Sequence, residues 1–252
     1  MKRSAILVYG LVCYAVFFAT FLYAVGFLAN AVVPKSIDSG ALGSPALAVV
    51  VNLALLGVFA LQHSIMARPG FKRVLTRVVP APAERATYVL ASSLALILLF
   101  WGWQPIGGHL YAVENEIGRA LLYALFAAGV ALVLYATFLI DHFDLFGLRQ
   151  VVLHFRGRPY REKSFATPSL YRHIRHPLYV GWFVSFWATP DMTWGHLLFA
   201  AVSTGYILVA VVLEERDLAE VLGPDYREWR ASTPKFLPAR RRRPAPGRAA
   251  TA

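Results

Sequence analysis

Residues 171–181 read YRHIRHPLYVG, a stretch rich in Arg, His and Tyr that directly precedes the last long apolar segment of the chain. The mostly apolar residues 182–213 follow it, and the polar runs EERDL at 214–218 and GPDYR at 223–227 come next, before Trp229. An apolar segment of this length can fold back on itself inside a bilayer, which brings both of its ends to the same side. We therefore expect the two polar clusters to meet at one face of a membrane.

The composition indicates an integral membrane protein. Of the 252 residues, 58% are hydrophobic and 15% are charged, whereas a soluble domain carries about 25% charged residues. The first apolar run extends to Val33, which is too long for the hydrophobic region of a signal peptide. The single cysteine, Cys13, excludes an intrachain disulfide and a site built from several thiolates.

The hydrophobic pattern predicts an all-α integral membrane protein with about five to six transmembrane helices. The expected helices cover residues 6–33, 46–67, 88–103, 119–140, 178–188 and 194–213. Residues 178–213 are too many for one crossing of a hydrocarbon core of about 30 Å, and Pro190 and Asp191 favour a turn within them. We expect a C-terminal helical hairpin there, and whether its shorter helix crosses the bilayer stays open.

The basic residues are distributed unevenly along the chain. All but two of the 25 Lys and Arg residues lie in the N-terminus, in 68–85, in 141–176 or after residue 213. The positive-inside rule then places both termini in the cytoplasm, in a membrane of the bacterial inner-membrane type. The net charge of +11 is explained by this topology and by attraction to the lipid bilayer, so no nucleic-acid partner is expected.

Four polar clusters share the predicted cytoplasmic side and can converge on a pocket. They are 62–64 (Gln-His-Ser), 141–150, 175–177 (Arg-His-Pro) and 214–217. Each also has a structural explanation, since His63 can be an interfacial histidine and Glu214 and Glu215 can pair with nearby Arg. Acids such as Asp141 and Asp144 at a helix C-terminus oppose the helix dipole, which favours a functional role.

A metal site is not expected. The histidines near these clusters, His63, His142, His173 and His176, contain no pair with the i, i+4 spacing of a preformed helical ligand pair. The chain also has no glycine-rich phosphate loop.

The C-terminal clusters, taken in order, resemble the signature of the isoprenylcysteine carboxyl methyltransferase superfamily. The matching residues are Arg175, His176, Pro177, Tyr179, Gly181, Glu214, Glu215 and Tyr226. The chain departs from that pattern at Trp229, where a second Tyr is usual, and at Thr233, where Val is usual.

Residues 5–238 are more similar still to membrane-bound methanethiol S-methyltransferases. The similarity is carried by 62–69, 142–150, 186–190 and 195–197. This resemblance implies methyl transfer from S-adenosylmethionine to methanethiol, with dimethyl sulfide as product and hydrogen sulfide as a lesser acceptor. It implies one membrane methyltransferase domain over 1–239, with a donor-binding part at 171–230 and a cytoplasmic pocket, and we expect 240–252 to be a disordered basic tail.

The resemblance also suggests roles for individual residues. Cofactor binding is expected from Tyr171, Arg175, His176, Pro177, Tyr179, Gly181, Glu214, Glu215, Asp217 and Tyr226. His142, oriented by Asp141 or Asp144, is the first candidate for the base that deprotonates the thiol, and His63 is the second. His63, Arg149 and Gln150 are the expected substrate contacts.

Two other functions stay open on the sequence. A related pattern occurs in membrane sterol reductases, which use NADPH. The chain could also be a non-catalytic membrane protein that binds a small molecule. The sequence leaves the oligomeric state open.

Overall fold

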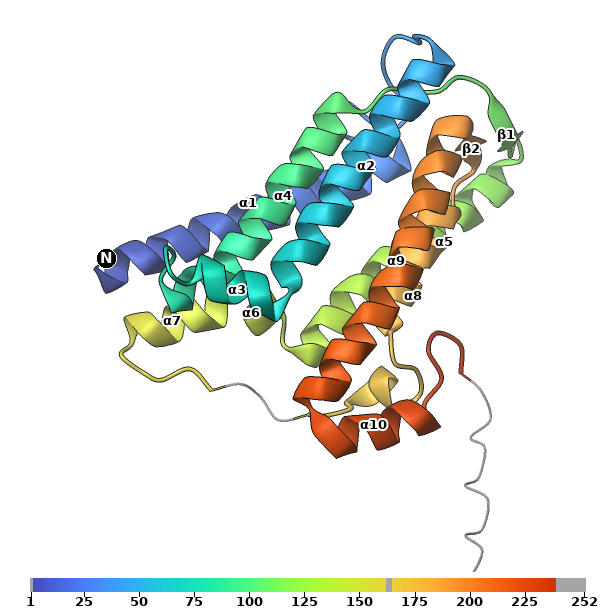
Figure 1. The fold of residues 1–252 in the computed structure, drawn as a ribbon. Helices are drawn as coiled ribbons and strands as arrows, with labels where there is room; N and C mark the ends of the chain where they lie inside the picture. The colour runs from blue at the N-terminus through green and yellow to red at the C-terminus, as the bar shows by residue number, and fades with distance from the viewer. Residues whose placement is uncertain (1, 162–164, 239–252) are drawn as a thin grey trace, which may run out of the picture.

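The computed structural model describes residues 2–161 and 165–238, and its regular secondary structure is almost entirely helical (Figure 1). The helices are α1 (Arg3–Ala29), α2 (Pro45–Ala67), α3 (Pro69–Leu75), α4 (Glu84–Gly102), α5 (Glu116–Ile140), α6 (His142–Leu145), α7 (Leu148–Phe155), α8 (Pro177–Trp187), α9 (Trp194–Val221) and α10 (Gly223–Ser232). Two 3-10 turns, η1 (Ala81–Ala83) and η2 (Ser169–Arg172), and two short strands, β1 (His109–Ala112) and β2 (Asp191–Thr193), complete the chain. The predicted tail at 240–252 lies outside the described residues.

Within the described residues, five helices are long and apolar enough to cross a membrane: α1, α2, α4 extended by η1, α5 and α9. This confirms the predicted all-α integral membrane class. The remaining apolar helix, α8, has 11 residues. Its length of about 16 Å is about half of a hydrocarbon core, so α8 does not cross the bilayer by itself.

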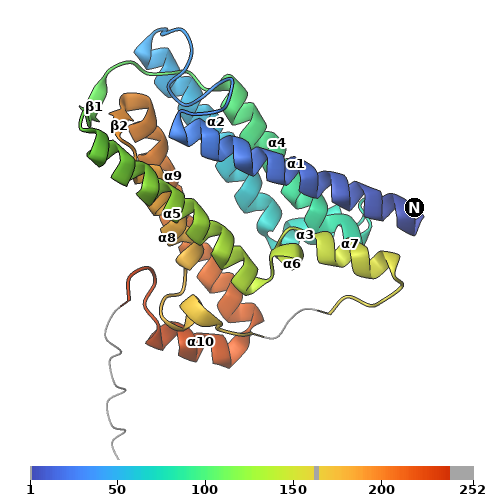
Figure 2. The same cartoon turned by 180° about the vertical axis from the view of Figure 1, so that it is seen from behind.

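The long helices form two groups that share one core (Figures 1 and 2). In the first group α1 and α2 both pack on α4, and in the second α8 packs on α5 and α9. Aromatic side chains from both groups meet in the core, among them Phe27, Phe100, Trp103, Phe186 and Phe199. At one end of the molecule lie β1 and β2, and at the other lie α3, α6, α7 and α10 (Figure 1).

Two glycines allow α5 and α8 to pack closely. A Cβ atom on Gly181 would lie 2.7 Å from the carbonyl oxygen of Gly129, and one on Gly129 would lie 2.6 Å from Oγ of Ser185. Only a residue without a side chain fits at this separation. Gly181, expected to contact the cofactor, therefore lies in a helix contact and outside the cavity described below.

The polar segments contain more helix than their composition predicts. Helix α9 continues to Val221, so the acids expected after it lie on its last turns. The expected loops 68–85 and 141–176 hold α3, α6 and α7. Helix α7 is amphipathic, and it buries Leu148 and Val151 beneath the N-terminal part of α1 (Figure 2). This tertiary burial, and not local propensity, makes a helix there.

A two-stranded antiparallel sheet at the opposite end was not predicted. In it His109 faces Thr193 and Ala112 faces Asp191. Asp191, expected only as a turn residue, accepts two hydrogen bonds from Arg119 at 2.9 and 2.8 Å. These bonds hold its carboxyl pKa below the ordinary value.

Candidate active site

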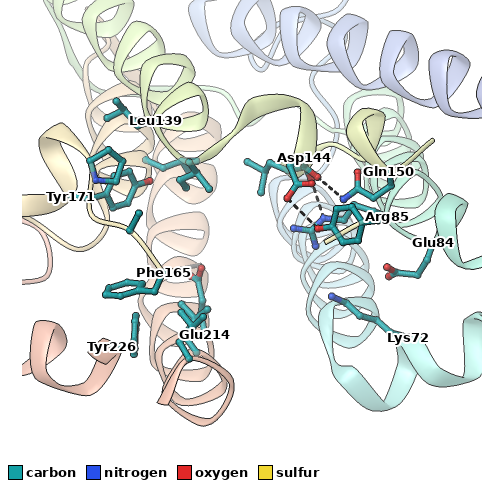
Figure 3. A pocket seen from close by; sticks show the side chains of 18 of the residues that line it. Lys72, Glu84, Arg85, Leu139, Asp144, Gln150, Phe165, Tyr171, Glu214 and Tyr226 are labelled. Atoms are coloured by element: carbon teal, nitrogen blue, oxygen red, sulfur yellow. Dashed lines mark hydrogen bonds between the residues drawn. The ribbon is translucent and has the colours of Figure 1, made fainter. Parts of the chain in front are cut away.

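A cavity of about 870 Å³ opens at the end of the bundle that carries α3, α6, α7 and α10. Its C-terminal wall consists of Phe165, Tyr171, Arg175, His176, Tyr179, Glu214, Tyr226 and Trp229. Its N-terminal wall consists of Lys72, Glu84, Arg85, Asp144, Gln150 and His154. Figure 3 shows side chains of the two walls facing each other across the cavity.

The C-terminal wall surrounds one carboxylate with aromatic rings. The hydroxyl of Tyr179 donates to Oε2 of Glu214 at 2.8 Å. The ring of Phe165 meets the rings of Tyr226 and Trp229 edge-on, with centroids 5.6 and 5.3 Å apart. Burial, together with the charges of Glu215 and Glu214, raises the pKa of Tyr226 to about 12. The phenols therefore stay neutral, and the negative charge of this wall comes from Glu214.

The adjacent acid, Glu215, points away from the cavity into a buried ion cluster. Its side chain is 1% exposed, and its Oε1 lies 2.8 Å from Arg175 NH1 and 2.9 Å from His176 Nε2. Its Oε2 lies 3.2 Å from Arg230. Consecutive side chains on a helix point in directions about 100° apart. The two acids therefore lie in different surroundings: Glu214 lines the cavity, and Glu215 holds the cluster together.

Backbone contacts hold the Arg-His-Pro corner against the C-terminal segment. The N–H of Arg175 donates to the carbonyl of Pro234 at 2.9 Å, and that of His176 donates to the carbonyl of Lys235 at 3.1 Å. Pro177 occupies the first turn of α8, where its missing N–H has no helical partner to lose. The start of α8 therefore accounts for a proline at position 177.

The N-terminal wall is polar and comes from three separate segments. Arg85 Nε donates to the carbonyl of Leu145 at 3.0 Å, and Gln150 Nε2 donates to the carbonyl of Asp144 at 3.1 Å (Figure 3). Two buried oxygens in this wall, Oε1 of Glu84 and Oε1 of Gln150, have no hydrogen-bond partner among the described residues. They are available to accept hydrogen bonds from a bound molecule, because buried acceptors are normally satisfied.

Gly147, which lies between α6 and α7, packs against the backbone of α4. Its φ is 86°, and a Cβ atom on it would lie 2.6 Å from the backbone nitrogen of Ala86. Asp141 both ends α5 and begins α6, and its Oδ1 accepts the N–H of Asp144 at 3.2 Å. An acid at a helix N-terminus is favourable. Asp141 therefore has a structural role as the N-cap of α6, and this accounts for an acid at the C-terminus of α5.

His142 lies behind this wall and does not line the cavity. Thr137 Oγ1 donates to the carbonyl of Leu134 at 2.6 Å, so it accepts a hydrogen bond from His142 Nδ1 at 2.8 Å. Nε2 then accepts from the hydroxyl of Tyr14 at 2.8 Å. Burial lowers the pKa of this imidazole, and the nearby charge of Asp141 opposes the shift in part. Both ring nitrogens of a neutral His142 are thus engaged.

Three other predicted residues also lie outside the cavity lining. His63 Nε2 lies 2.9 Å from the hydroxyl of Tyr88. Asp217 forms an ion pair with Arg68 at 2.6 Å, which ties α9 to the junction of α2 and α3. Arg149 supports Asp144 from behind, with its NH1 3.2 Å from Oδ1.

Eight of the predicted site residues line the cavity together. They are Asp144, Gln150, Tyr171, Arg175, His176, Tyr179, Glu214 and Tyr226. Sequence reasoning missed Lys72, Glu84, Arg85 and His154, which belong to no local motif. In residues 2–161 and 165–238, no group of three His, Cys, Asp or Glu side chains is arranged to hold a metal ion.

Comparison with known proteins identifies close relatives along nearly the whole chain. The methanethiol S-methyltransferase of Crocosphaera subtropica is 52% identical over 94% of this chain and 93% of its own length. That of Mycobacterium tuberculosis is 53% identical over 94% and 98%. Nurim of Xenopus laevis is 32% identical over 67% of this chain and 62% of its own length.

No family model matches the chain. No solved structure matches it either. The extent of the identity with the bacterial enzymes nevertheless establishes the relationship, and the chain belongs to the methanethiol S-methyltransferase family.

Proposed function

We propose that this protein transfers a methyl group from S-adenosylmethionine to methanethiol, giving dimethyl sulfide, with hydrogen sulfide as a lesser acceptor. The observation that carries the proposal is the cavity, which in a chain of this family sets the carboxylate of Glu214 among aromatic rings at one end of the membrane bundle. A carboxylate and π faces are the groups that stabilise a sulfonium cation.

The cavity has the size and the polar groups that such a donor requires. Its volume of about 870 Å³ lies in the range of about 300–1,000 Å³ found for small-molecule sites. Three buried polar atoms without a partner among the described residues, Arg175 Nε, Glu84 Oε1 and Gln150 Oε1, suit the donor's hydrogen-bonding groups. When bound, the donor supplies a methyl group activated by the positive charge on sulfur.

The C-terminal wall is the proposed donor site. Glu214, oriented by Tyr179, faces the positive charge, and Tyr171 and Tyr226 offer ring faces beside it. Arg175 offers its unpaired Nε to the donor's carboxylate or hydroxyls. Glu215 acts through Arg175 and His176, so we propose it as a positioning residue.

The thiol is proposed to enter from the apolar side of the cavity, which Leu139, Ile140 and Leu178 line. Methyl transfer is an in-line displacement: the thiol sulfur forms a bond to the methyl carbon while the donor's sulfur–carbon bond breaks, and the thiol proton is released. Holding the two sulfur atoms in line in a water-poor site supplies most of the rate enhancement.

His142 is better placed to position the N-terminal wall than to take the thiol proton. Its two ring nitrogens join Tyr14 of α1 and Thr137 of α5, and it is the first residue of α6, which carries Asp144. The role of His63 near the substrate stays a prediction. Single-turnover rates measured against pH test the base: if His142→Gln removes the acidic limb of the profile, His142 is the base after all.

The activity is tested on purified protein in detergent. Incubation with S-adenosylmethionine and methanethiol should release dimethyl sulfide into the headspace, and hydrogen sulfide should give a lower rate of methanethiol formation. Stabilisation by NADPH without any volatile sulfide would favour the reductase alternative. Binding of a small molecule without turnover of either donor would favour the binding protein.

The distribution of Lys and Arg supports an inner-membrane protein with its termini and its cavity in the cytoplasm. Reporter fusions at the N-terminus and in the β1 region distinguish the two sides. The N-terminal fusion should report the cytoplasm, and the β1 fusion should report the opposite side.

A further inference from the structure

A second, outer pocket of about 320 Å³ lies beside α10. Its lining consists of Arg175, Glu215, Arg227, Arg230, Ala231 and Lys235. Figure 1 shows α10 running across the end of α9, with the segment after it turning back toward α8. Arg175 lines both pockets, but Arg227, Arg230 and Lys235 do not line the proposed active site.

The outer pocket carries more positive than negative charge. Glu215 is the one acid among the residues that line it, and four lining residues are cations. Arg230 and Lys235 approach Oε2 of Glu215 at 3.2 and 4.0 Å, but their side chains are 43% and 40% exposed, against 1% for Glu215. A buried carboxylate thus holds these cations in place while part of each side chain stays accessible.

Their arrangement suits a phosphate group. Guanidinium groups bind phosphate through paired N–H donors, and an ammonium adds a point charge. The segment carrying Lys235 is fixed by two backbone hydrogen bonds, from Arg175 to Pro234 and from His176 to Lys235, at 2.9 and 3.1 Å. The backbone that carries Lys235 therefore needs little further ordering when an anion binds.

The surroundings place this pocket at the edge of the apolar surface. Leu237, two residues after Lys235, is 76% exposed, and the intervening Phe236 packs against Phe183 with ring centroids 5.3 Å apart. The last apolar span, α9, ends two residues before α10 begins. Basic residues directly beyond a span attract anionic headgroups.

We propose that the outer pocket binds a phosphate group, carried either by an anionic phospholipid headgroup or by a free phosphate. The bound group fixes α10 and the segment after it at the end of α9. This proposal does not depend on the reaction in the main cavity.

The test uses the full chain in detergent at constant ionic strength. Unfolding midpoints are titrated with short-chain phosphatidylglycerol, with short-chain phosphatidylcholine and with inorganic phosphate. The test variant is Arg227→Gln with Lys235→Gln. The charge-matched control is Arg73→Gln with Arg216→Gln, because both arginines are exposed and neither lines the main cavity or the outer pocket.

An anionic probe should raise the unfolding midpoint of the wild type in a saturable way. Its affinity, read from this titration, should fall about twentyfold in the test variant, and the control should keep the wild-type affinity. A response to phosphatidylglycerol alone identifies a lipid headgroup, and a response to both anionic probes, or to inorganic phosphate alone, identifies the phosphate itself. Equal weakening in both variants, an equal response to phosphatidylcholine, or no saturable response overturns the proposal. If the double variant does not fold, Arg227→Gln alone provides the same comparison.

Discussion

The two walls of the cavity are built in different ways. The C-terminal wall comes from 165–229 of the sequence, is largely aromatic, and is supported from behind by the buried cluster around Glu215. The N-terminal wall comes from three separate segments, is mostly charged or polar, and is supported by backbone contacts to Arg85 and Gly147. One wall depends on buried electrostatics, and the other depends on close backbone packing.

This difference separates the residues that face a ligand from those that hold them. In the C-terminal wall, neighbouring acids divide the two tasks, since Glu214 lines the cavity and Glu215 lies in the cluster behind it. In the N-terminal wall, Asp144 and Gln150 face the cavity, and His142 and Gly147 hold the corner. Substitutions of residues that face the cavity should therefore lower activity, whereas substitutions of the residues that hold them should lower stability.

The largest effect is expected from Glu215→Gln, which removes the support of the C-terminal wall. It leaves Arg175 and His176 buried without their carboxylate, and breaking such a cluster costs about 3–5 kcal/mol. Thermal and denaturant unfolding in detergent measure the loss. Glu220→Gln is the control, because Glu220 is exposed and pairs only with exposed Arg216 among the described residues. Equal stability of the two variants would refute the buried-support model.

Next in size, Glu214→Gln should reduce methyl transfer and leave the fold intact. Removing a charge aimed at the reacting group typically lowers the rate about 100-fold. Headspace measurement of dimethyl sulfide gives the activity, and the unfolding midpoint should match that of the wild type. Tyr179→Phe, which removes only the hydroxyl bound to Glu214, should lose less. Full activity in Glu214→Gln would remove this acid from the donor site.

A smaller effect is expected from Gly147→Ala, which disturbs the N-terminal wall. The added methyl group would lie 2.6 Å from the nitrogen of Ala86 on a backbone with φ of 86°, and such overpacking costs about 2 kcal/mol. Gly57→Ala is the matched control, since nothing lies within 4 Å of its added carbon. Similar unfolding curves for both variants would show that the close approach to α4 is not required.

The smallest effect is a dependence of stability on pH through His142. Its folded-state pKa lies below the ordinary value of 6.5, so below that pH the unfolded chain binds the proton more readily. The contribution of neutral His142 is therefore complete above pH 6.5 and is lost as the pH falls toward the folded pKa. Unfolding midpoints measured from neutral to acidic pH should show a shallower slope in His142→Gln. An unchanged slope would mean that another group dominates.

The sequence was most informative where the functional residues lie close together in it. The Arg-His-Pro corner and the two acids were identified from residues 171–229, and six of the predicted residues from this region line the cavity. Periodicity and hydropathy also located the long helices, because burial in lipid requires long apolar runs. The directions of Glu214 and Glu215 were not predicted, because the sequence did not reveal that α9 continues past both acids.

The membrane class, the helical hairpin and most residues of the C-terminal wall could be predicted from the sequence, because they depend on local order and on continuous apolar runs. The N-terminal wall, the position of His142 behind it and the different surroundings of Glu214 and Glu215 followed only from the packing of the folded chain. Each of these depends on contacts between distant segments, such as Arg85 with Leu145, Tyr14 with His142 and Glu215 with Arg175. Such contacts leave no periodic signal in the sequence, because they join distant residues that come together only when the helices pack.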